Sequence, residues 1–361
     1  MRNGERTFSR AWLERHVGSV RQLGGIRAFE LVEGRARGTR CFQVDTGSGL
    51  AFTVVADRGL DIADCSFKGV NLVYHTPGGI AHPAFYDPAG LEWLRSFFAG
   101  LVTTCGLTYF GAPGRDGSEE LGLHGRYSAM PAVRVCDQSR WEGDEYLLEL
   151  VGSVEECVPF GNKLRLTRTI RSRIGSRSIH LHDVVENFGA GASPFTMLYH
   201  VNPGYPLLSE GSEILVSSSA VEPYDAHSAA ESAEMYSVRE PTTGYAEVNY
   251  LHTMAADEKG RARAGLINRQ MSGGLGLSLS FDVRTLPYLS EWKMLSPVDY
   301  VVGLEPVNTK IANRAELRAT GRLPTLEPGE VREMDLEFSV LEGKTEIDDF
   351  VAEVERIRRG L

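Results

Sequence analysis

The chain contains 361 residues, of which 42% are hydrophobic and 24% are charged, and its formal net charge is −10 at pH 7. These values are typical of a soluble globular protein with a sizeable core, and the acidic balance argues against nucleic acid or an anionic membrane as a partner. No apolar run approaches the roughly 18 residues of a membrane-spanning helix, no apolar leader is present, and the five cysteines form no CxxC pair, so we expect a cytoplasmic protein with reduced thiols.

Short segments rich in Val, Leu, Phe and Tyr recur along the chain between frequent glycines and prolines. Most of them alternate polar with apolar residues, and this period of two is typical of a strand with one buried face. Such segments cover residues 49–55, 146–151, 163–170, 178–185, 275–281 and 333–340. Turns between them predict a mainly β protein built from a large antiparallel sheet system.

Few segments show helical spacing. A short helix is expected over residues 8–16. Asp87 and Pro88 provide an N-cap and a proline at the first helical position of a second one, along which Leu91, Leu94, Phe97 and Phe98 follow at helical spacing. Residues 345–359 carry an apolar stripe that predicts an amphipathic C-terminal helix. Because we find no internal repeat, low-complexity segment or linker, we expect a single domain.

The chain lacks the motifs of phosphate-binding loops, dinucleotide folds, zinc proteases and serine hydrolases. Two other polar motifs lie in turn contexts. The guanidinium of Arg58, within residues 56–62, could donate forked hydrogen bonds to a substrate hydroxyl or carboxylate. Alternatively, Arg58 could belong to an Asp/Arg turn pair. His124, between Gly122 and Gly125, could be approached closely by a substrate, or it could bond the backbone of its loop.

Two further motifs combine a strand end with a rigid turn. His200 ends an apolar run and is followed by Asn202 and Pro203, a good platform for a proton-transfer group; a satisfied core histidine is the alternative. Glu305 follows an apolar run and precedes Pro306. Such surroundings raise the pKa of a carboxyl group and suit a general base, whereas a salt-bridged glutamate at a strand end is the alternative.

Aromatic and basic residues near these motifs are further candidates. Trp292 could stack on the apolar face of a sugar or pack in the core, and Arg126 and Lys293 could contact an anionic group of a substrate. His180 and His182 share one face of a strand, but no third ligand is near them in the sequence, so we expect no metal site.

Taken together, the motifs resemble the aldose 1-epimerase (galactose mutarotase) superfamily, and more narrowly its uncharacterised bacterial branch known as a domain of unknown function. The order fits: an early arginine, a Leu-His-Gly motif, a strand-ending histidine followed by Asn and an aromatic residue, and a late Leu-Glu-Pro. The strand pattern resembles the superfamily from about residue 25 to residue 342. The resemblance implies one galactose mutarotase-like β-supersandwich domain over residues 1–361, with a few short helices.

The resemblance also implies a mechanism that needs no cofactor or metal. Glu305 would be the general base that takes the proton of the anomeric hydroxyl, and His200 would be the general acid that protonates the ring oxygen. His124 would bind or orient the sugar near the anomeric centre. The expected substrate contacts are Arg58, Asn202, Trp292, Lys293 and Arg126. No residue matches the family's sugar-binding aspartate, so the sugar is left open.

We therefore expect an aldose 1-epimerase-like isomerase that acts on a neutral, acidic or phosphorylated monosaccharide, and self-association into a homodimer is left open. The alternative is a non-catalytic carbohydrate-binding protein on the same scaffold. Another carbohydrate epimerase, a lyase or a glycosidase ranks third, because hydrolysis usually needs two carboxylates and only Glu305 stands out. The whole hypothesis requires His200 and Glu305 to meet in one sugar-sized cavity.

Overall fold

Two large antiparallel sheets make up most of the described residues, which are 2–3, 6–7, 9–271 and 273–360 of this computed structural model. In spatial order, the first sheet consists of β11 (Val133–Asp137), β13 (Glu145–Cys157), β14 (Lys163–Arg173), β15 (Ser178–Asn187), β26 (Val331–Glu342), β22 (Leu275–Asp282), β21 (Arg261–Asn268) and β18 (Glu213–Val216), with β12 (Arg140–Glu142) beside β13. The second consists of β19 (Ser218–Pro223), β20 (Val248–Met254), β23 (Tyr288–Leu295), β24 (Tyr300–Val307), β17 (Leu198–Val201), β8 (Val102–Cys105), β6 (Asp61–Phe67), β5 (Leu50–Val55), β4 (Arg40–Asp45) and β3 (Gly25–Glu30), with β7 (Val70–Asn71) beside β6.

Short strand pairs and helices surround these sheets. The pairs are β1 (Arg2–Asn3) with β2 (Arg6–Thr7), β9 (Gly114–Asp116) with β10 (Glu119–Leu121), and β16 (Ser193–Pro194) with β25 (Thr325–Leu326). The α-helices are α1 (Arg10–Glu14), α2 (Ala226–Ala230), α3 (Arg314–Ala319) and α4 (Lys344–Arg358). The 3₁₀ turns are η1 (Val20–Gln22), η2 (Gly34–Ala36), η3 (Pro83–Phe85), η4 (Glu92–Ser96), η5 (Tyr127–Ala129) and η6 (Ser232–Glu234).

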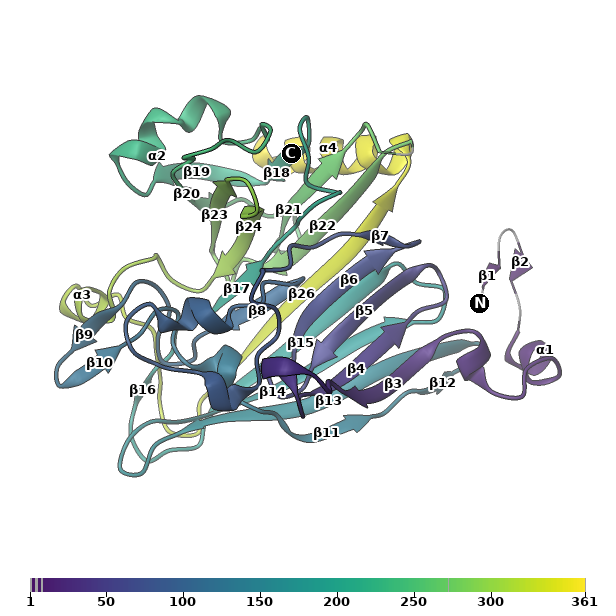
Figure 1. Ribbon diagram of the computed structural model, residues 1–361, viewed down its shortest axis with the longest axis horizontal. Helices are drawn as coiled ribbons and strands as arrows, with labels where there is room; N and C mark the ends of the chain where they lie inside the picture. Colours follow the sequence, from purple (N-terminus) through teal and green to yellow (C-terminus); the bar gives the residue numbers. More distant parts are fainter. Residues whose placement is uncertain (1, 4–5, 8, 272, 361) are drawn as a thin grey trace.

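The main hydrophobic core lies between the sheets, where the purple strands β3–β6 pass in front of the teal strands β13–β15 (Figure 1). Alternation decides which side chains enter it: on β15, Ile179 and Leu181 are buried, whereas His180 between them is exposed. Phe52 and Val54 enter it from β5. The six segments predicted from alternation lie in β5, β13, β14, β15, β22 and β26, so the predicted mainly β fold is confirmed.

An ionic network crosses this core and links the two sheets. Arg168 on β14 donates in bidentate fashion to Asp183 on β15, at 2.8 and 2.7 Å, and to Asp61 on β6 of the other sheet, at 2.6 Å. Tyr199 on β17 donates its hydroxyl to Asp183 at 2.7 Å. All four side chains are fully buried, so the network depends on these internal partners rather than on water.

The helical segments differ from their predictions in extent. The predicted C-terminal helix is α4, whose buried face packs Ile347, Phe350 and Val354 against the first sheet. The predicted N-terminal helix is limited to α1, and residue 8 lies outside the described residues. After Asp87 only the 3₁₀ turn η4 forms, because its apolar residues do not share one buried face: Trp93 is buried, while Leu94 beside it is exposed.

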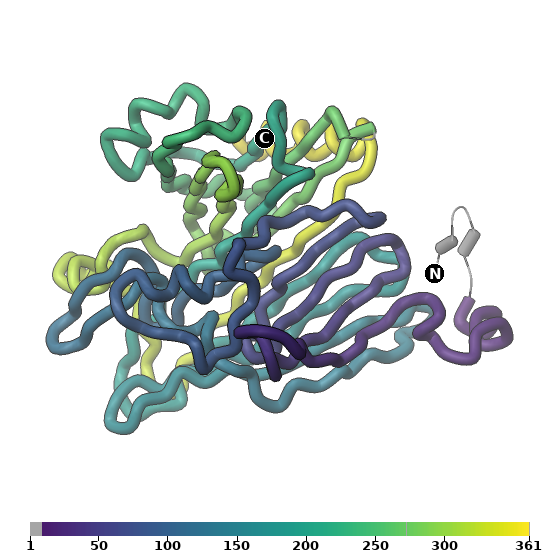
Figure 2. The backbone as a smooth tube through the Cα atoms, viewed as in Figure 1, coloured from purple at the N-terminus to yellow at the C-terminus, as the bar shows by residue number. Residues whose placement is uncertain are grey.

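The connection from β7 to β8, residues 72–101, bears on the site more than any regular element does. Figure 2 shows it as a blue coil beside the purple strands β3–β6. It carries η3 and η4 and returns to the second sheet at β8, next to β17. Among the described residues, no helix is long and apolar enough to cross a membrane.

Candidate active site

Adjacent strands of the second sheet bring two distant residues together. β17 and β24 are antiparallel with Val201 opposite Leu304, and this register sets His200 directly opposite Glu305. Both side chains are buried, and Nε2 of His200 lies 3.2 Å from Oε1 of Glu305. On the other side of β24, β23 places Ser290 opposite Glu305. Strand pairing alone therefore aligns a hydroxyl, a carboxyl and an imidazole in one row.

Glu305 is held in a space that its own strand leaves open. Gly303 lies two residues earlier on the same face, and a Cβ at Gly303 would come within 2.3 Å of Oε1 of Glu305. Burial raises the pKa of Glu305 to about 8, the Ser290 hydroxyl opposes this shift, and nearby Glu247 adds to it. Burial therefore favours the protonated form of this carboxyl group at neutral pH.

The tautomer of His200 follows from its neighbour Asn202. The amide nitrogen of Asn202 donates to the carbonyl oxygens of His200, at 2.7 Å, and of Gly100, at 3.1 Å, so its amide oxygen faces the ring and accepts from Nδ1 of His200. Nε2 is then the nitrogen that faces Glu305. Burial, together with the nearby His124, lowers the pKa of His200 to about 3, so the ring is neutral and its unprotonated Nε2 lies beside Glu305.

His124 approaches the pair from a different segment. Its backbone adopts a φ of 57°, and Gly125 follows with a φ of 74° in a place where a Cβ would lie 2.2 Å from the Tyr109 carbonyl oxygen. The ring centroids of His124 and His200 are 5.8 Å apart. Desolvation lowers the pKa of His124 to about 4, and its buried Nδ1 has no hydrogen-bond partner among the described residues.

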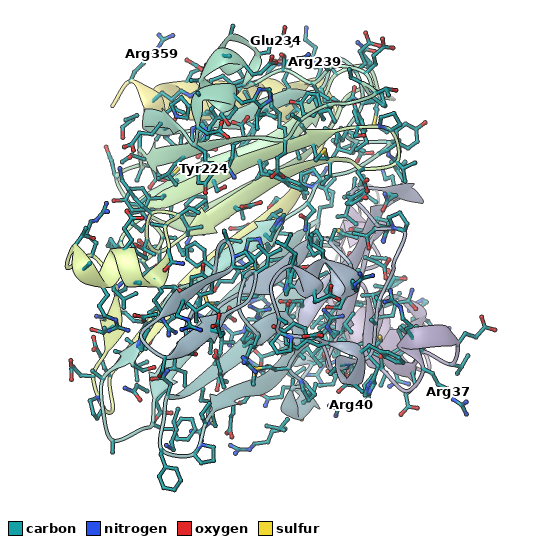
Figure 3. The ribbon with its side chains drawn as sticks, turned by 60° about the vertical axis from the view of Figure 1, so that its left-hand side comes forward. Arg37, Arg40, Tyr224, Glu234, Arg239 and Arg359 are labelled. Carbon is teal, nitrogen blue, oxygen red and sulfur yellow. The ribbon has the colours of Figure 1, made fainter. Side chains whose placement is uncertain are left out.

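These three side chains line a cavity of about 420 Å³, within the usual range of about 300–1,000 Å³ for small-molecule sites. Its aromatic walls are Trp93, Phe97, Phe110, Tyr224 and Trp292. Tyr224 (Figure 3) lies between β19 and α2 in the chain and is one of the lining residues. The other polar side chains that line the cavity are Asp225, Ser228, Glu247 and Asn249. Apolar walls with a few convergent polar groups suit a sugar, which has both C–H faces and hydroxyl groups.

Trp292 is the predicted contact residue that the structure places in this cavity. Its ring centroid lies 5.4 Å from that of His200, nearly perpendicular to it. Its indole nitrogen donates to Oε2 of Glu247 at 2.8 Å, which fixes the orientation of the ring. Asn202 lies behind His200 rather than among the lining residues, so it positions the imidazole instead of contacting a ligand.

Three basic residues expected at the site lie elsewhere, which corrects their predicted role. The buried guanidinium of Arg58 donates to three backbone carbonyls, those of Ala81, Ser96 and Ser128. Lys293 points to the opposite face of β23 from Trp292 and bonds the carbonyls of Glu234, Met235 and Ser237. Arg126 lines a separate small hollow together with Tyr86 and Glu156. None of these three cations lines the cavity, and Arg58 and Lys293 instead bind loop carbonyl groups.

Sequence reasoning missed the polar groups on the far side of the cavity. Glu247 and Asn249 flank the buried Val248 at the start of β20, and Ser290 donates to the amide oxygen of Asn249 at 3.1 Å. Polar residues that alternate with buried ones at a strand entry are the signal that could have found them. His180 and His182 lie on the outer face of the first sheet, where His182 pairs with Asp335 at 2.8 Å.

Known structures with the same fold support the sheet arrangement. A protein from Klebsiella pneumoniae, described as a "putative aldose 1-epimerase", superposes with a TM-score of 0.87 and 26% sequence identity over 92% of this chain and 87% of that one. A galactose mutarotase-like protein from Clostridium acetobutylicum gives a TM-score of 0.64 and 12% identity over 90% of this chain and 100% of that one. A galactose 1-epimerase from Lactobacillus acidophilus gives a TM-score of 0.57 and 11% sequence identity over 89% of this chain and 100% of that one. The protein therefore has the galactose mutarotase-like fold.

The family assignment is narrower than the fold. The model of the family described as "Domain of unknown function (DUF4432)" matches residues 36–340, and the chain belongs to this family. No curated protein sequence matches the chain. The predicted superfamily and its branch of unknown function are thereby confirmed.

Proposed function

We propose that the protein is an aldose 1-epimerase, a mutarotase that interconverts the anomers of an aldose by opening and closing its ring. The observation that carries this proposal is the 3.2 Å approach of His200 Nε2 and Glu305 Oε1 in a sugar-sized cavity. Ring opening needs one group to accept the proton of the anomeric hydroxyl and another to protonate the ring oxygen. A carboxyl group and an imidazole that share one proton provide both.

The proton balance of the cycle follows from the pair. In the reactive form, Glu305 is a carboxylate and His200 is an imidazolium protonated on both nitrogens. Glu305 accepts the O1 proton while Nε2–H of His200 protonates O5, and the C1–O5 bond breaks to give the open aldehyde. Rotation about the C1–C2 bond presents the other face of the carbonyl. Both proton transfers then run backwards, which closes the ring as the other anomer and restores the pair.

Substrate binding shifts the shared proton into that reactive form. Burial favours the uncharged pair, with the proton on Glu305. An anomeric hydroxyl that donates to Glu305 stabilises its carboxylate, and a ring oxygen that accepts from His200 stabilises its imidazolium. Both contacts therefore move the proton from Glu305 to His200. His124, which lines the same cavity, binds a sugar hydroxyl beside them.

The charge of the cavity favours a neutral aldose. Among the described residues that line it, three are carboxylic acids, Asp225, Glu247 and Glu305, and none is Lys or Arg. A phosphate or carboxylate on the sugar ring would meet acidic groups without a compensating cation, which is unfavourable in a partly buried site. Acidic and amide oxygens instead accept hydrogen bonds from sugar hydroxyl groups.

Polarimetry on freshly dissolved anomers of neutral aldoses, with glucose and galactose first, tests this function. The protein should accelerate equilibration, and Glu305→Gln should lower kcat by about 10²–10⁴-fold, the usual effect of losing a positioned proton-transfer group. The matched control is Glu337→Gln, because Glu337 lies on the outer face of the first sheet near His180. An unchanged rate in Glu305→Gln would contradict the assigned base. Sugar binding without any acceleration would instead identify a carbohydrate-binding protein.

A further inference from the structure

A second cavity adjoins the candidate active site. It has a volume of about 550 Å³ and shares four lining residues with the first cavity: Leu94, Phe97, Glu247 and Trp292. The indole of Trp292, held by its bond to Glu247, thus borders both cavities. The volume beyond it is larger than that around His200 and Glu305, and the catalytic scheme above makes no use of it.

The walls of the second cavity come from four parts of the chain. The β7–β8 connection contributes Tyr74, Thr76 and Arg95, and the β23–β24 hairpin contributes Met294 and Asp299. Arg35 and Glu247 come from the two other parts. The hydroxyl of Tyr74 donates to Oδ1 of Asp299 at 2.8 Å, which holds this carboxylate at the cavity wall. Aromatic surfaces therefore alternate with hydrogen-bonding groups here, as they do in the first cavity.

The charges of these walls offset one another. Arg35 and Arg95 are the cations, and Glu247 and Asp299 are the anions. The guanidinium of Arg35 already donates to the carbonyl oxygens of Arg95, at 2.9 Å, and Gly78, at 3.0 Å, and Arg95 is paired with Glu92. A strongly anionic group would face two carboxylates, Glu247 and Asp299, and two guanidinium groups that already donate to other partners. A neutral group with both donors and acceptors fits better.

We propose that this cavity binds a second sugar ring, joined by a glycosidic bond to the aldose whose anomeric carbon lies between His200 and Glu305. The substrate class would be a reducing disaccharide, or the reducing end of a longer saccharide. The anomeric hydroxyl of the first ring must remain free for ring opening, so the second ring is attached through another hydroxyl. Trp292, at the border, packs against the C–H face of the sugars. This inference rests on the proposed mutarotase activity.

The substrate preference of the intact protein tests the proposal. Initial rates are measured by polarimetry or NMR on fresh anomers of maltose, cellobiose and β-1,4-galactobiose, against glucose, galactose and glucose 6-phosphate. We expect kcat/KM for at least one disaccharide to exceed that for its own reducing-end monosaccharide by about tenfold, mainly through a lower KM. Equal or lower values for every disaccharide would overturn the proposal. A preference for the phosphate would overturn it too, in favour of an anionic group in the second cavity.

A variant locates the effect. Asp299→Ala removes the carboxylate that Tyr74 holds, and it should reduce the preference for the disaccharide over the monosaccharide by about fivefold or more. The matched control is Asp335→Ala, because Asp335 pairs with His182 on the outer face of the first sheet, and its preference should equal that of the wild type. A preference that survives Asp299→Ala unchanged places the second ring elsewhere and contradicts the proposal.

Calorimetry separates this inference from the proposed function. If no sugar is epimerised but a disaccharide binds at least about tenfold more tightly than its reducing-end monosaccharide, the proposed activity fails and the second sugar site stands. If monosaccharides are epimerised and disaccharides bind no better, the activity stands and the second sugar site fails. If the protein neither epimerises nor binds any of these sugars, both proposals fail.

Discussion

Two sets of buried ionisable groups lie on opposite sides of β17, and they differ in whether their carboxyl groups have a cationic partner. Tyr199 points into the core, where Arg168 joins Asp61 and Asp183 across the two sheets. His200, the next residue, points into the cavity toward Glu305. In the first set, each carboxylate accepts from a guanidinium and a hydroxyl. In the second, Glu305 has no cation, and its Oε1 has no well-formed hydrogen bond among the described residues.

This contrast separates a structural role from a chemical one. Burial by itself lowers the pKa of Arg168, but Asp183 and Asp61 outweigh it and hold that pKa well above its ordinary value, so the guanidinium is fixed in its charged form. Burial without a cation raises the pKa of Glu305 to about 8, within reach of neutral pH. A paired group keeps one protonation state, whereas a carboxyl group without a cation beside an imidazole can exchange a proton. Perturbed groups of the second kind mark candidate active sites.

Removal of Arg168 from the buried ionic network should cause the largest loss of stability. Arg168→Met leaves Asp61 and Asp183 buried without their cation, and we expect a loss of about 3–5 kcal/mol in the free energy of unfolding. Urea denaturation of the purified variant measures it. The control is Arg165→Met on the same strand, because Arg165 forms partly exposed pairs with Glu155 and Glu186 and should cost only about 0–1 kcal/mol. Equal losses in the two variants would show that the network does not link the sheets.

The pH dependence of stability should reveal the unpaired carboxyl group. The pKa of Glu305 is raised to about 8, so the folded state binds a proton that the unfolded state releases, and stability falls as pH rises toward 8. Up to about pH 7.5 the lowered pKa values of His200 and His124 act in the opposite sense, because the histidines of the unfolded state still bind part of a proton there. The contribution of Glu305 is therefore the difference between the wild type and a variant that keeps both histidines but lacks this carboxyl group.

Between pH 6.5 and pH 8 we expect the Glu305 contribution to the free energy of unfolding to fall by roughly 1.5 kcal/mol, because the slope of about 1.4 kcal/mol for each pH unit is halved as the pH reaches the pKa. Urea unfolding at pH 6.5 and at pH 8 measures the change in the wild type and in the variants. Glu305→Gln should lose this fall and keep only the small rise from the two histidines, whereas Glu337→Gln should keep the wild-type dependence. A slope that persists in Glu305→Gln would assign the titrating group to another residue.

Local patterns explain why part of this site was predictable. His200 and Glu305 each lie in an apolar strand, with a proline three residues after His200 and directly after Glu305, and a polar residue in such a run stands out in the sequence. Arg58 and Lys293 stand out in the same way, but their partners are backbone carbonyls of distant segments. Hydrogen bonds between segments far apart in the chain leave no mark in the local pattern, so a structural cation and a substrate-binding cation look alike.

The remaining walls of the cavity depend on how loops meet. Trp93, in η4, reaches the cavity through a connection whose helical spacing predicted an ordinary helix. Glu247 enters it only because β20 pairs with β23, which sets Asn249 opposite Trp292. The strands could be predicted because their alternation is local, whereas strand order and loop packing are long-range properties that one sequence does not display.

Asn202 gives the smallest expected effect and tests how closely the two regions differ. Asn202→Ala removes the acceptor that fixes the proton of His200 on Nδ1, so the ring can present the wrong nitrogen to Glu305. We expect kcat for mutarotation to fall by about tenfold with KM nearly unchanged, because a misplaced proton donor weakens the transition state more than sugar binding. The control is Asn268→Ala, because Asn268 is equally buried but bonds Leu207 and Ser209 outside the cavity. Asn268→Ala should lose stability without this fall in kcat. Equal losses of kcat in both variants would show that Asn202 has only a structural role.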